Sequence, residues 1–374
     1  MTPLLAGIGL YVLLQLAIGV VASRRIKTED DYLVAGRSLG PVLATFTVFA
    51  TWFGAETCIA AAGAVYTDGL AGGSADPFGY GLCIVLAGAI LAVPLWRLRL
   101  TTLADLFRLR FDASVERLAV VLMVPTSLFW AAAQVRAFGQ VLSAASGFEV
   151  ELALGLAATI VAARSERIAR NATLVAGGSY LLIGLLPVTL GVLGSVLVPG
   201  LTESEQVLPV LAERYLPTFL AVVFSGALVS AILSTVDSAL LVAAGLVSHN
   251  VVVQMRPGLT ERQKVRIARV LVVGFGVLAW LMAARAERVY ELIEQASAFG
   301  SSGIVVVVLF GLFTRIGGTP SAVASLLAGV VSWCVGAYVW DLPYPYLTSL
   351  AVAAAAYLVT AVLSSAEVRV LEPA

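Results

Sequence analysis

The stretch SGALVSAILSTVDSALLVAAGLVSHN, residues 225–250, decides the fold class of this chain. It is long enough to cross a bilayer as a helix, which takes about 20 residues. Ser234, Thr235 and Asp237 lie at its centre among Ala, Leu, Val and Ile. Single hydroxyls often bond to their own helix or join two helices. Together with a carboxylate in an apolar run, however, they predict a functional site, and their hard oxygens suit a cation such as sodium.

The composition excludes several classes of function. The 374 residues are 60% hydrophobic and 12% charged, whereas a soluble domain carries about 25% charged residues. Lys plus Arg equals Asp plus Glu at 23 each, so nothing favours a nucleic-acid partner. The three cysteines form no metal or redox spacing. Because no catalytic motif is present, we expect a membrane protein that is not an enzyme and needs no cofactor.

Apolar runs predict ten membrane spans, at 3–23, 41–66, 78–96, 117–145, 172–199, 217–250, 268–284, 289–314, 319–340 and 345–364. A half-length run at 152–163 is counted as another, which predicts about 11 crossings with the N-terminus outside and the C-terminus inside. Only three of the 23 basic residues then lie in outer segments, and Arg136 lies within a span. This asymmetry follows the positive-inside rule and predicts an all-α, polytopic protein of the cytoplasmic (inner) membrane.

Polar residues also interrupt three other spans. In ATWFGAET, residues 50–57, Gly54 lies near Glu56. The helix either breaks there, freeing carbonyls for a cation, or only kinks or crosses another helix closely. In a later span, Arg136 follows Gln134; it either pairs with a buried acid, Glu56 or Asp237, or contacts an anionic solute. Glu294 enters the apolar run at 289–314 and could line a cavity.

Several of these segments resemble the sodium:solute symporter family. The resemblance rests on DYLVAGRSLG (31–40), ATWFGAET (50–57), AAQVRAFGQVL (132–142), ARSERIAR (163–170) and SAILSTVDSALL (230–241). It implies the five-plus-five inverted-repeat fold of the leucine transporter. It also implies a sodium site formed by the carbonyls of Ala50, Phe53 and Ala231 and the hydroxyls of Ser234 and Thr235.

The same resemblance implies further binding residues. Asp237 falls near the second ion site of some family members, and the solute pocket falls on Trp52, Glu56, Gln134 and Glu294. The expected function is sodium-coupled symport of a small organic solute. The expected partners are the solute, Na⁺ as coupling ion and the lipid bilayer.

The chain departs from the family in its length. Residues 152–163 lead directly into ARSERIAR, which indicates an internal deletion of core helices five and six with its junction near 161–164. Residues 1–374 would then form a single transmembrane domain whose solute site lacks one wall. The alternative function is therefore a shortened, transport-inactive homologue that acts as a membrane sensor or partner subunit.

Overall fold

The structure is a computed structural model that describes residues 3–24, 26–146, 166–286 and 288–364. Every regular element in these ranges is helical. The α-helices are α1 (Pro3–Ser23), α2 (Glu29–Val34), α3 (Pro41–Trp52), α4 (Ala62–Asp68), α5 (Tyr80–Leu86), α6 (Ala92–Arg97), α7 (Ala104–Arg110), α8 (Ala113–Ser146), α10 (Glu166–Leu197), α11 (Val207–Tyr215), α12 (Thr218–Val247), α13 (Glu261–Ala283), α14 (Val289–Ala298), α15 (Ser301–Phe313), α16 (Thr319–Tyr338) and α17 (Pro345–Leu363).

Short 3₁₀ or π segments connect several of these helices. They are η1 (Ala35–Arg37), η2 (Glu56–Ala61), η3 (Gly69–Gly73), η4 (Ser74–Gly79), η5 (Ala87–Leu91), η6 (Ser204–Gln206) and η7 (Ser248–Val253). The half-length span predicted at 152–163 and the junction expected at 161–164 lie outside the described residues.

Eight helical stretches of the described chain are long and apolar enough to cross a membrane. They are Glu56–Arg97, Ala113–Val141, Arg170–Leu197, Thr218–Val253, Glu261–Ala283, Val289–Phe313, Thr319–Tyr338 and Pro345–Leu363, and the shorter apolar helices are Ala6–Val21 and Pro41–Trp52. The predicted all-α, multi-pass membrane fold is therefore confirmed, whereas the number of about 11 crossings stays a prediction.

The chain divides into two compact units. The first comprises residues 1–93, 129–241 and 273–293, and the second comprises residues 94–128, 242–272 and 294–374. Because several long helices pass from one unit into the other, neither unit is a continuous segment of sequence. The first unit holds almost every polar residue that the sequence singled out.

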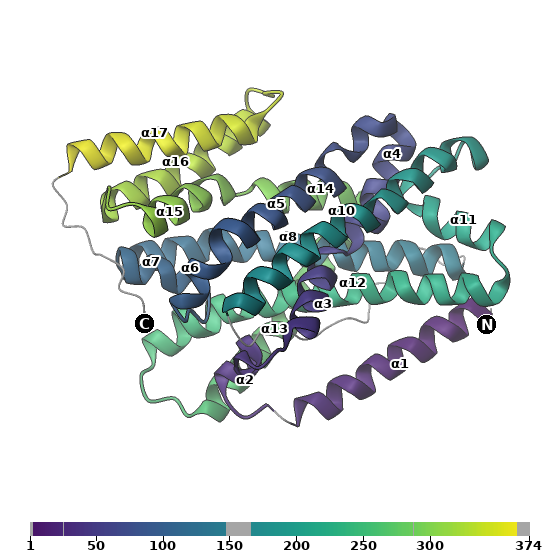
Figure 1. Cartoon of the computed structure of the whole chain (residues 1–374), viewed down its shortest axis with the longest axis horizontal. Helices are drawn as coiled ribbons and strands as arrows, with labels where there is room; N and C mark the ends of the chain where they lie inside the picture. The colour runs from purple at the N-terminus through teal and green to yellow at the C-terminus, as the bar shows by residue number, and fades with distance from the viewer. Residues whose placement is uncertain (1–2, 25, 147–165, 287, 365–374) are drawn as a thin grey trace. The chain divides into compact units, whose positions relative to one another are not determined.

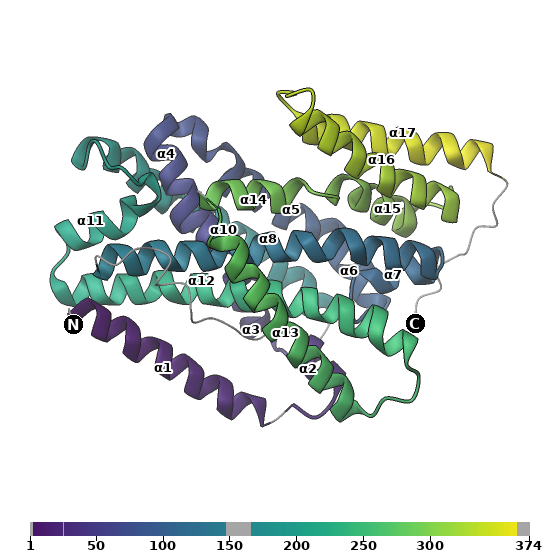
Figure 2. The same ribbon diagram turned by 180° about the vertical axis from the view of Figure 1, so that it is seen from behind.

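In the first unit, α10 packs against α3, α4, α5 and α11. Figure 2 shows α4, α10 and α11 close together. Glycines allow the close approach, because a Cβ on Gly191 would lie 2.6 Å from the carbonyl oxygen of Ala62 and one on Gly184 would lie 2.3 Å from Pro77 Cβ. Small residues let membrane helices pack backbone to backbone, and here they hold α10 against the segments that follow α3.

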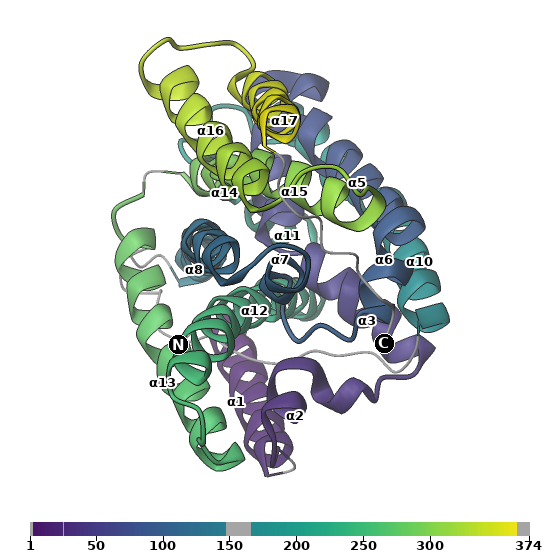
Figure 3. The ribbon, with the colours of Figure 1, turned by 90° about the vertical axis from the view of Figure 1, so that its left-hand side faces the viewer.

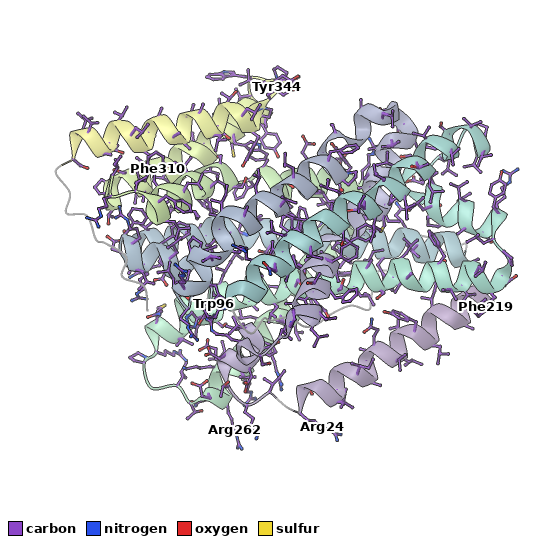
Figure 4. The ribbon with its side chains drawn as sticks, viewed as in Figure 1. Arg24, Trp96, Phe219, Arg262, Phe310 and Tyr344 are labelled. Carbon is purple, nitrogen blue, oxygen red and sulfur yellow. The ribbon has the colours of Figure 1, made fainter. Side chains whose placement is uncertain are left out.

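In the second unit, α16 packs against α15 and α17, and Figure 3 shows α16 and α17 side by side. A Cβ on Gly303 would lie 2.8 Å from Leu326 Cα, so α15 and α16 also meet at small residues. Phe310 of α15 stacks on Tyr357 of α17 with ring centroids 4.5 Å apart. Figure 4 shows Phe310 in this helical layer and Tyr344 at the connection that leads into α17.

A polar network joins α7, α8 and η7 within the second unit. The Asn250 amide donates to Asp105 Oδ1 at 2.6 Å and to Glu116 Oε1 at 2.9 Å. The Asn250 amide oxygen accepts a hydrogen bond from the Thr102 hydroxyl. His249 Nε2 lies 3.5 Å from Asp105 Oδ1. Burial alone would raise the pKa of Asp105, but hydrogen bonds from His249 and from backbone N–H groups outweigh it and hold that pKa below its usual value.

Candidate ion and solute site at the break between α3 and η2

The helical run formed by α3 and η2 is broken at Gly54. The helix α3 begins after an extended Gly40, with Pro41 in its first turn, and it ends at Trp52. Phe53 has φ −88° and ψ 75°, which is not helical, and the chain resumes helical geometry in η2 at Glu56. Pro at the first position favours a helix start because its missing N–H would be unpaired there anyway. Of the two alternatives for this segment, the structure has the break.

The break frees the carbonyl oxygen of Ala50. In an unbroken helix this oxygen would accept the N–H of Gly54, four residues later. That N–H instead donates to Glu56 Oε1 at 3.2 Å. The oxygen of Ala50 accepts hydrogen bonds from α12, at 2.7 Å from the Ser234 hydroxyl and at 3.2 Å from the Thr235 hydroxyl. The residues around 50 and 234 are thus in direct contact, although they are far apart in sequence.

The same two hydroxyls also donate to the carbonyl oxygen of Ala231, at 2.7 Å from Ser234 and at 3.3 Å from Thr235. The structure therefore brings together four of the five residues predicted for sodium, and we call Ala50, Ala231, Ser234 and Thr235 the neutral oxygen cluster. Phe53, the fifth residue, is the point at which α3 ends. All five oxygens would be neutral, which is chemistry that a hard alkali cation accepts.

A close crossing at Gly54 joins the neutral oxygen cluster to Glu56. A Cβ on Gly54 would lie 2.5 Å from Thr235 Oγ1, 2.8 Å from Gln134 Oε1 and 2.9 Å from Glu56 Oε2. The Gln134 amide donates to Glu56 Oε2 at 2.6 Å, and its oxygen accepts the Ala55 N–H at 2.8 Å. Two residues predicted for the solute pocket, Glu56 and Gln134, therefore meet directly.

The remaining predicted residues have different surroundings. Arg136 donates to the carbonyl oxygen of Ala283 at 3.4 Å. Glu56 accepts hydrogen bonds from the Gln134 amide and the Gly54 N–H. Asp237 is 7% exposed, and its Oδ1 accepts no hydrogen bond from the described residues. Glu294 belongs to the second compact unit, whereas the other predicted solute residues belong to the first.

Three half-buried aromatic rings group at the end of α3. The rings of Trp52 and Tyr80 are 6.4 Å apart between centroids and tilted by 57°. Tyr80 and Trp130 are 6.1 Å apart and tilted by 65°. We call these three residues the aromatic cluster. Trp52 was a predicted residue of the solute pocket. Tyr80 and Trp130 were not predicted, because they lie among other apolar residues and gave no polar signal.

A second polar group lies directly after the break and was also missed. Asp76 of η4 accepts hydrogen bonds from Thr57 at 3.0 Å and from Tyr180 at 2.9 Å, and the Thr57 and Tyr180 hydroxyl oxygens are 2.5 Å apart. All three side chains are buried. An acid at the start of the predicted span 78–96 was the available signal. No group of three or more His, Cys, Asp and Glu side chains in the described ranges could hold a metal ion.

Comparison with known proteins agrees with this geometry. Residues 32–165 and 173–329 match the sequence model of the sodium:solute symporter family. The chain therefore belongs to the sodium:solute symporter family, as the sequence motifs predicted, and sodium-coupled solute symport is the activity that this membership indicates. The family assignment covers both ends of the broken helix and the neutral oxygen cluster.

Particular relatives are similar over different lengths. A high-affinity choline transporter of Drosophila melanogaster is 36% identical over 141 residues, which cover 36% of this chain and only 22% of that protein. The human high affinity choline transporter is 22% identical over 462 positions, covering 92% of this chain and 78% of that protein. The solved structure of a Na⁺-coupled sialic acid symporter has a TM-score of 0.76 at 15% identity and covers 100% of this chain and 99% of that chain. This last likeness confirms the transporter fold.

Proposed function

We propose that the chain couples the movement of a small organic cation to Na⁺ bound in the neutral oxygen cluster. The observation that carries the proposal is the position of the Ser234 hydroxyl, 2.7 Å from the carbonyl oxygens of both Ala50 and Ala231. A sodium ion at this crossing would bind the lone pairs of the two hydroxyls and the carbonyls of Ala50, Phe53 and Ala231. Five neutral oxygens provide modest affinity, which suits an ion that must also leave.

Coupling would follow from the position of the ion between two helices. Sodium bound here would fix α3 against α12 through oxygens of both. Trp52 and Glu56 lie on the two sides of the same break, so a fixed crossing also fixes two residues of the proposed solute pocket. An ion that stabilises the solute-binding arrangement raises solute affinity, and by linkage the solute raises sodium affinity equally.

The chemistry of the pocket favours a positively charged solute with methyl groups on nitrogen. Aromatic faces attract cations, and aromatic cages recognise quaternary ammonium groups. The aromatic cluster supplies three such rings, and the buried Glu56, which accepts a hydrogen bond from the Gln134 amide, lies four residues after Trp52 across the helix break. Two of the similar proteins are choline transporters. The proposed solute residues are accordingly Trp52, Tyr80, Trp130, Glu56 and Gln134, and the role expected for Glu294 stays a prediction.

Asp237 is the proposed residue for a second ion. Its carboxyl is nearly buried and has an oxygen without a described partner. The neighbouring Ser238 hydroxyl lies 3.1 Å from the hydroxyl of Thr51 on α3. A second cation near these groups would again bridge α3 and α12.

A second candidate function is a transport-inactive homologue that acts as a membrane sensor or partner subunit. Its support is the length of the chain. The alignment with the human choline transporter runs over 462 positions, although this chain has 374 residues, so it contains gaps. The family match is interrupted between residues 165 and 173, next to the junction proposed near 161–164. A solute site without two core helices would bind ions without completing transport.

For the cellular setting, we infer a cytoplasmic membrane with the basic loops on the cytoplasmic side. The support is the distribution of Lys and Arg, of which only Arg214, Arg285 and Arg288 lie in the predicted outer segments.

The test is uptake into vesicles that contain the purified protein. We expect radiolabelled choline to accumulate with an inward sodium gradient and not with an equal potassium gradient. A panel with proline, glucose and a monocarboxylate compares solute classes at the same membrane potential. Sodium-independent choline uptake would contradict the coupling, and preference for a neutral or anionic solute would contradict the solute class. Sodium binding without uptake of any solute would favour the sensor or partner function.

A further inference from the structure

The group formed by Thr57, Asp76 and Tyr180, which we call the hydroxyl–carboxyl triangle, is held by three separate elements. Thr57 lies in η2, Asp76 in η4 and Tyr180 in α10. Tyr180 OH lies 2.9 Å and 3.0 Å from the two Asp76 carboxyl oxygens, and Thr57 Oγ1 lies 3.2 Å and 3.0 Å from them. The two hydroxyl oxygens are 2.5 Å apart. Each side chain is therefore within hydrogen-bond distance of both others.

Counting hydrogens shows that an ionised Asp76 cannot satisfy the triangle. A threonine and a tyrosine hydroxyl carry one hydrogen each, and an ionised carboxylate carries none. Three contacts would then share two hydrogens, and the third contact would bring two oxygen lone pairs together. If Asp76 is a neutral carboxylic acid, the group has three hydrogens for three contacts, and each contact is a hydrogen bond. With Asp76 ionised, the triangle therefore lacks one hydrogen, and a bound proton would supply it.

Among the described residues, no cationic side chain forms a hydrogen bond or ion pair with Asp76. The elements packed against η4 are η2, η3, α5 and α10. Apart from residues 166–170 of α10, the described titratable side chains of these elements are acids, thiols and phenols: Glu56 and Cys58 from η2, Tyr80 and Cys83 from α5, and Tyr180 from α10. The basic residues of α10 all precede Tyr180 by about three turns or more. A buried charge without a partner is costly, and such a group takes up a proton instead.

We propose that the hydroxyl–carboxyl triangle is a proton-binding site, in which Asp76 is a neutral carboxylic acid at neutral pH. The site is distinct from the neutral oxygen cluster, since none of its three residues contributes to the proposed sodium ligands. It lies directly after the same helix break, because Thr57 follows Glu56 in η2. Ionisable groups inside membrane transporters commonly serve as proton sites, and the inference holds whether or not the chain completes sodium-coupled transport.

Infrared spectroscopy of the full-length protein in lipid vesicles tests this proposal. A protonated carboxylic acid has a C=O stretching band that a carboxylate lacks, and this band shifts on exchange into D₂O. We expect the difference between the wild type and Asp76→Asn at neutral pH to contain one such band. Asn has nearly the shape of the neutral acid and both donates and accepts hydrogen bonds, so the triangle remains satisfied. Other carboxyl groups contribute equally to both spectra and cancel.

Two further variants locate the proton. Asp68→Asn removes an exposed carboxyl at the end of α4, and we expect no loss of a protonated band there. Tyr180→Phe removes one hydrogen-bond partner of Asp76, so the band should persist but move to higher frequency. This variant also carries the test if Asp76→Asn fails to fold.

Three results would overturn the proposal. The first is a wild-type minus Asp76→Asn difference without a protonated carboxyl band. The second is a band that Tyr180→Phe leaves unmoved, because the protonated acid would then lie outside the triangle. The third is a band that disappears when sodium replaces potassium at constant pH, which would make the triangle a sodium site.

Discussion

Two polar groups lie in the same compact unit, and only one of them contains an ionisable side chain. The neutral oxygen cluster contains two hydroxyls and two carbonyls. The hydroxyl–carboxyl triangle contains two hydroxyls and a carboxyl. In the first, each of the two hydroxyl hydrogens has two neutral carbonyl oxygens as acceptors, and a bound cation would replace those hydrogen bonds. In the second, a hydrogen is missing unless the acid is neutral. On the two proposals made above, similar hydroxyl chemistry would bind a metal cation in one place and a proton in the other.

The largest expected effect comes from adding a methyl group where the neutral oxygen cluster meets Glu56. A Cβ in Gly54→Ala would lie under 3 Å from three oxygens on three helical segments. Overpacking of this kind costs about 1–3 kcal/mol, and the displaced α12 would carry the hydroxyls away from Ala50. We expect sodium affinity to fall by up to roughly 150-fold, measured by binding of radiolabelled sodium.

Gly226→Ala is the matched control for that variant. Gly226 lies on α12 about two turns before Ser234, and a Cβ there would meet nothing within 4 Å. We expect its sodium affinity to equal that of the wild type. Equal losses in both variants would show that the effect is general disruption of the fold and not the crossing at Gly54.

The next effect concerns solute affinity and separates the aromatic cluster from the ion site. Trp52→Leu removes the first ring of the cluster, and a desolvated cation–aromatic contact contributes about 2 kcal/mol. We expect choline affinity to fall roughly 25-fold, measured by competition with radiolabelled choline, with Trp52→Phe in between. A wild-type affinity in Trp52→Leu would remove this residue from the solute pocket.

The smallest effect concerns another buried carboxyl, of which one oxygen accepts a backbone hydrogen bond and the other has no partner among the described residues. Glu205 of η6, in the predicted outer loop, lies against the position of Gly63 and accepts the Tyr290 N–H at 3.2 Å. Burial raises the pKa of Glu205, against backbone hydrogen bonds and the charge of Arg288, which lower it. A raised folded-state pKa of an acid means that the neutral form favours folding. The contribution of neutral Glu205 to the stability of the fold is fully present below the ordinary glutamate pKa of 4.5. It is lost as pH rises through the raised pKa.

The unfolding temperature of the wild type should therefore decline as pH rises above the ordinary glutamate pKa, and Glu205→Gln should remove part of that decline. The measurement is the unfolding temperature of both proteins over a pH series in the same detergent. Glu203→Gln, in the same loop but not buried, is the control. Parallel curves for the wild type and Glu205→Gln would contradict the raised pKa.

The sequence predicted the features that depend on local pattern. The apolar runs predicted the helical membrane fold, and Gly54 beside a buried acid gave a break as one of two alternatives. The contact between Ala50 and Ser234 followed from the family resemblance, because spacing alone does not say which distant helices meet. Local pattern also placed Glu56 and Gln134 among the interior polar residues, although not against each other.

Features that depend on long-range packing could not be predicted from the sequence. Asp76 and Tyr180 are about 100 residues apart, and each looks ordinary in its own segment. Tyr80 and Trp130 become a cluster with Trp52 only when three segments pack together. The assignment of Glu294 to a different compact unit from Glu56 likewise depends on contacts between distant helices. Periodicity and hydropathy report which face of a helix is buried, but not which partner buries it.

Sodium binding to the purified protein tests the account most directly. The double variant Ser234→Ala and Thr235→Ala is compared with Ser230→Ala, which changes a serine one turn earlier on α12 that is outside the neutral oxygen cluster. Loss of a hydrogen-bonding group costs about 1–3 kcal/mol, so we predict at least a tenfold loss of affinity for radiolabelled sodium in the double variant and none in the control. Wild-type sodium affinity in the double variant would contradict the ion site between α3 and α12.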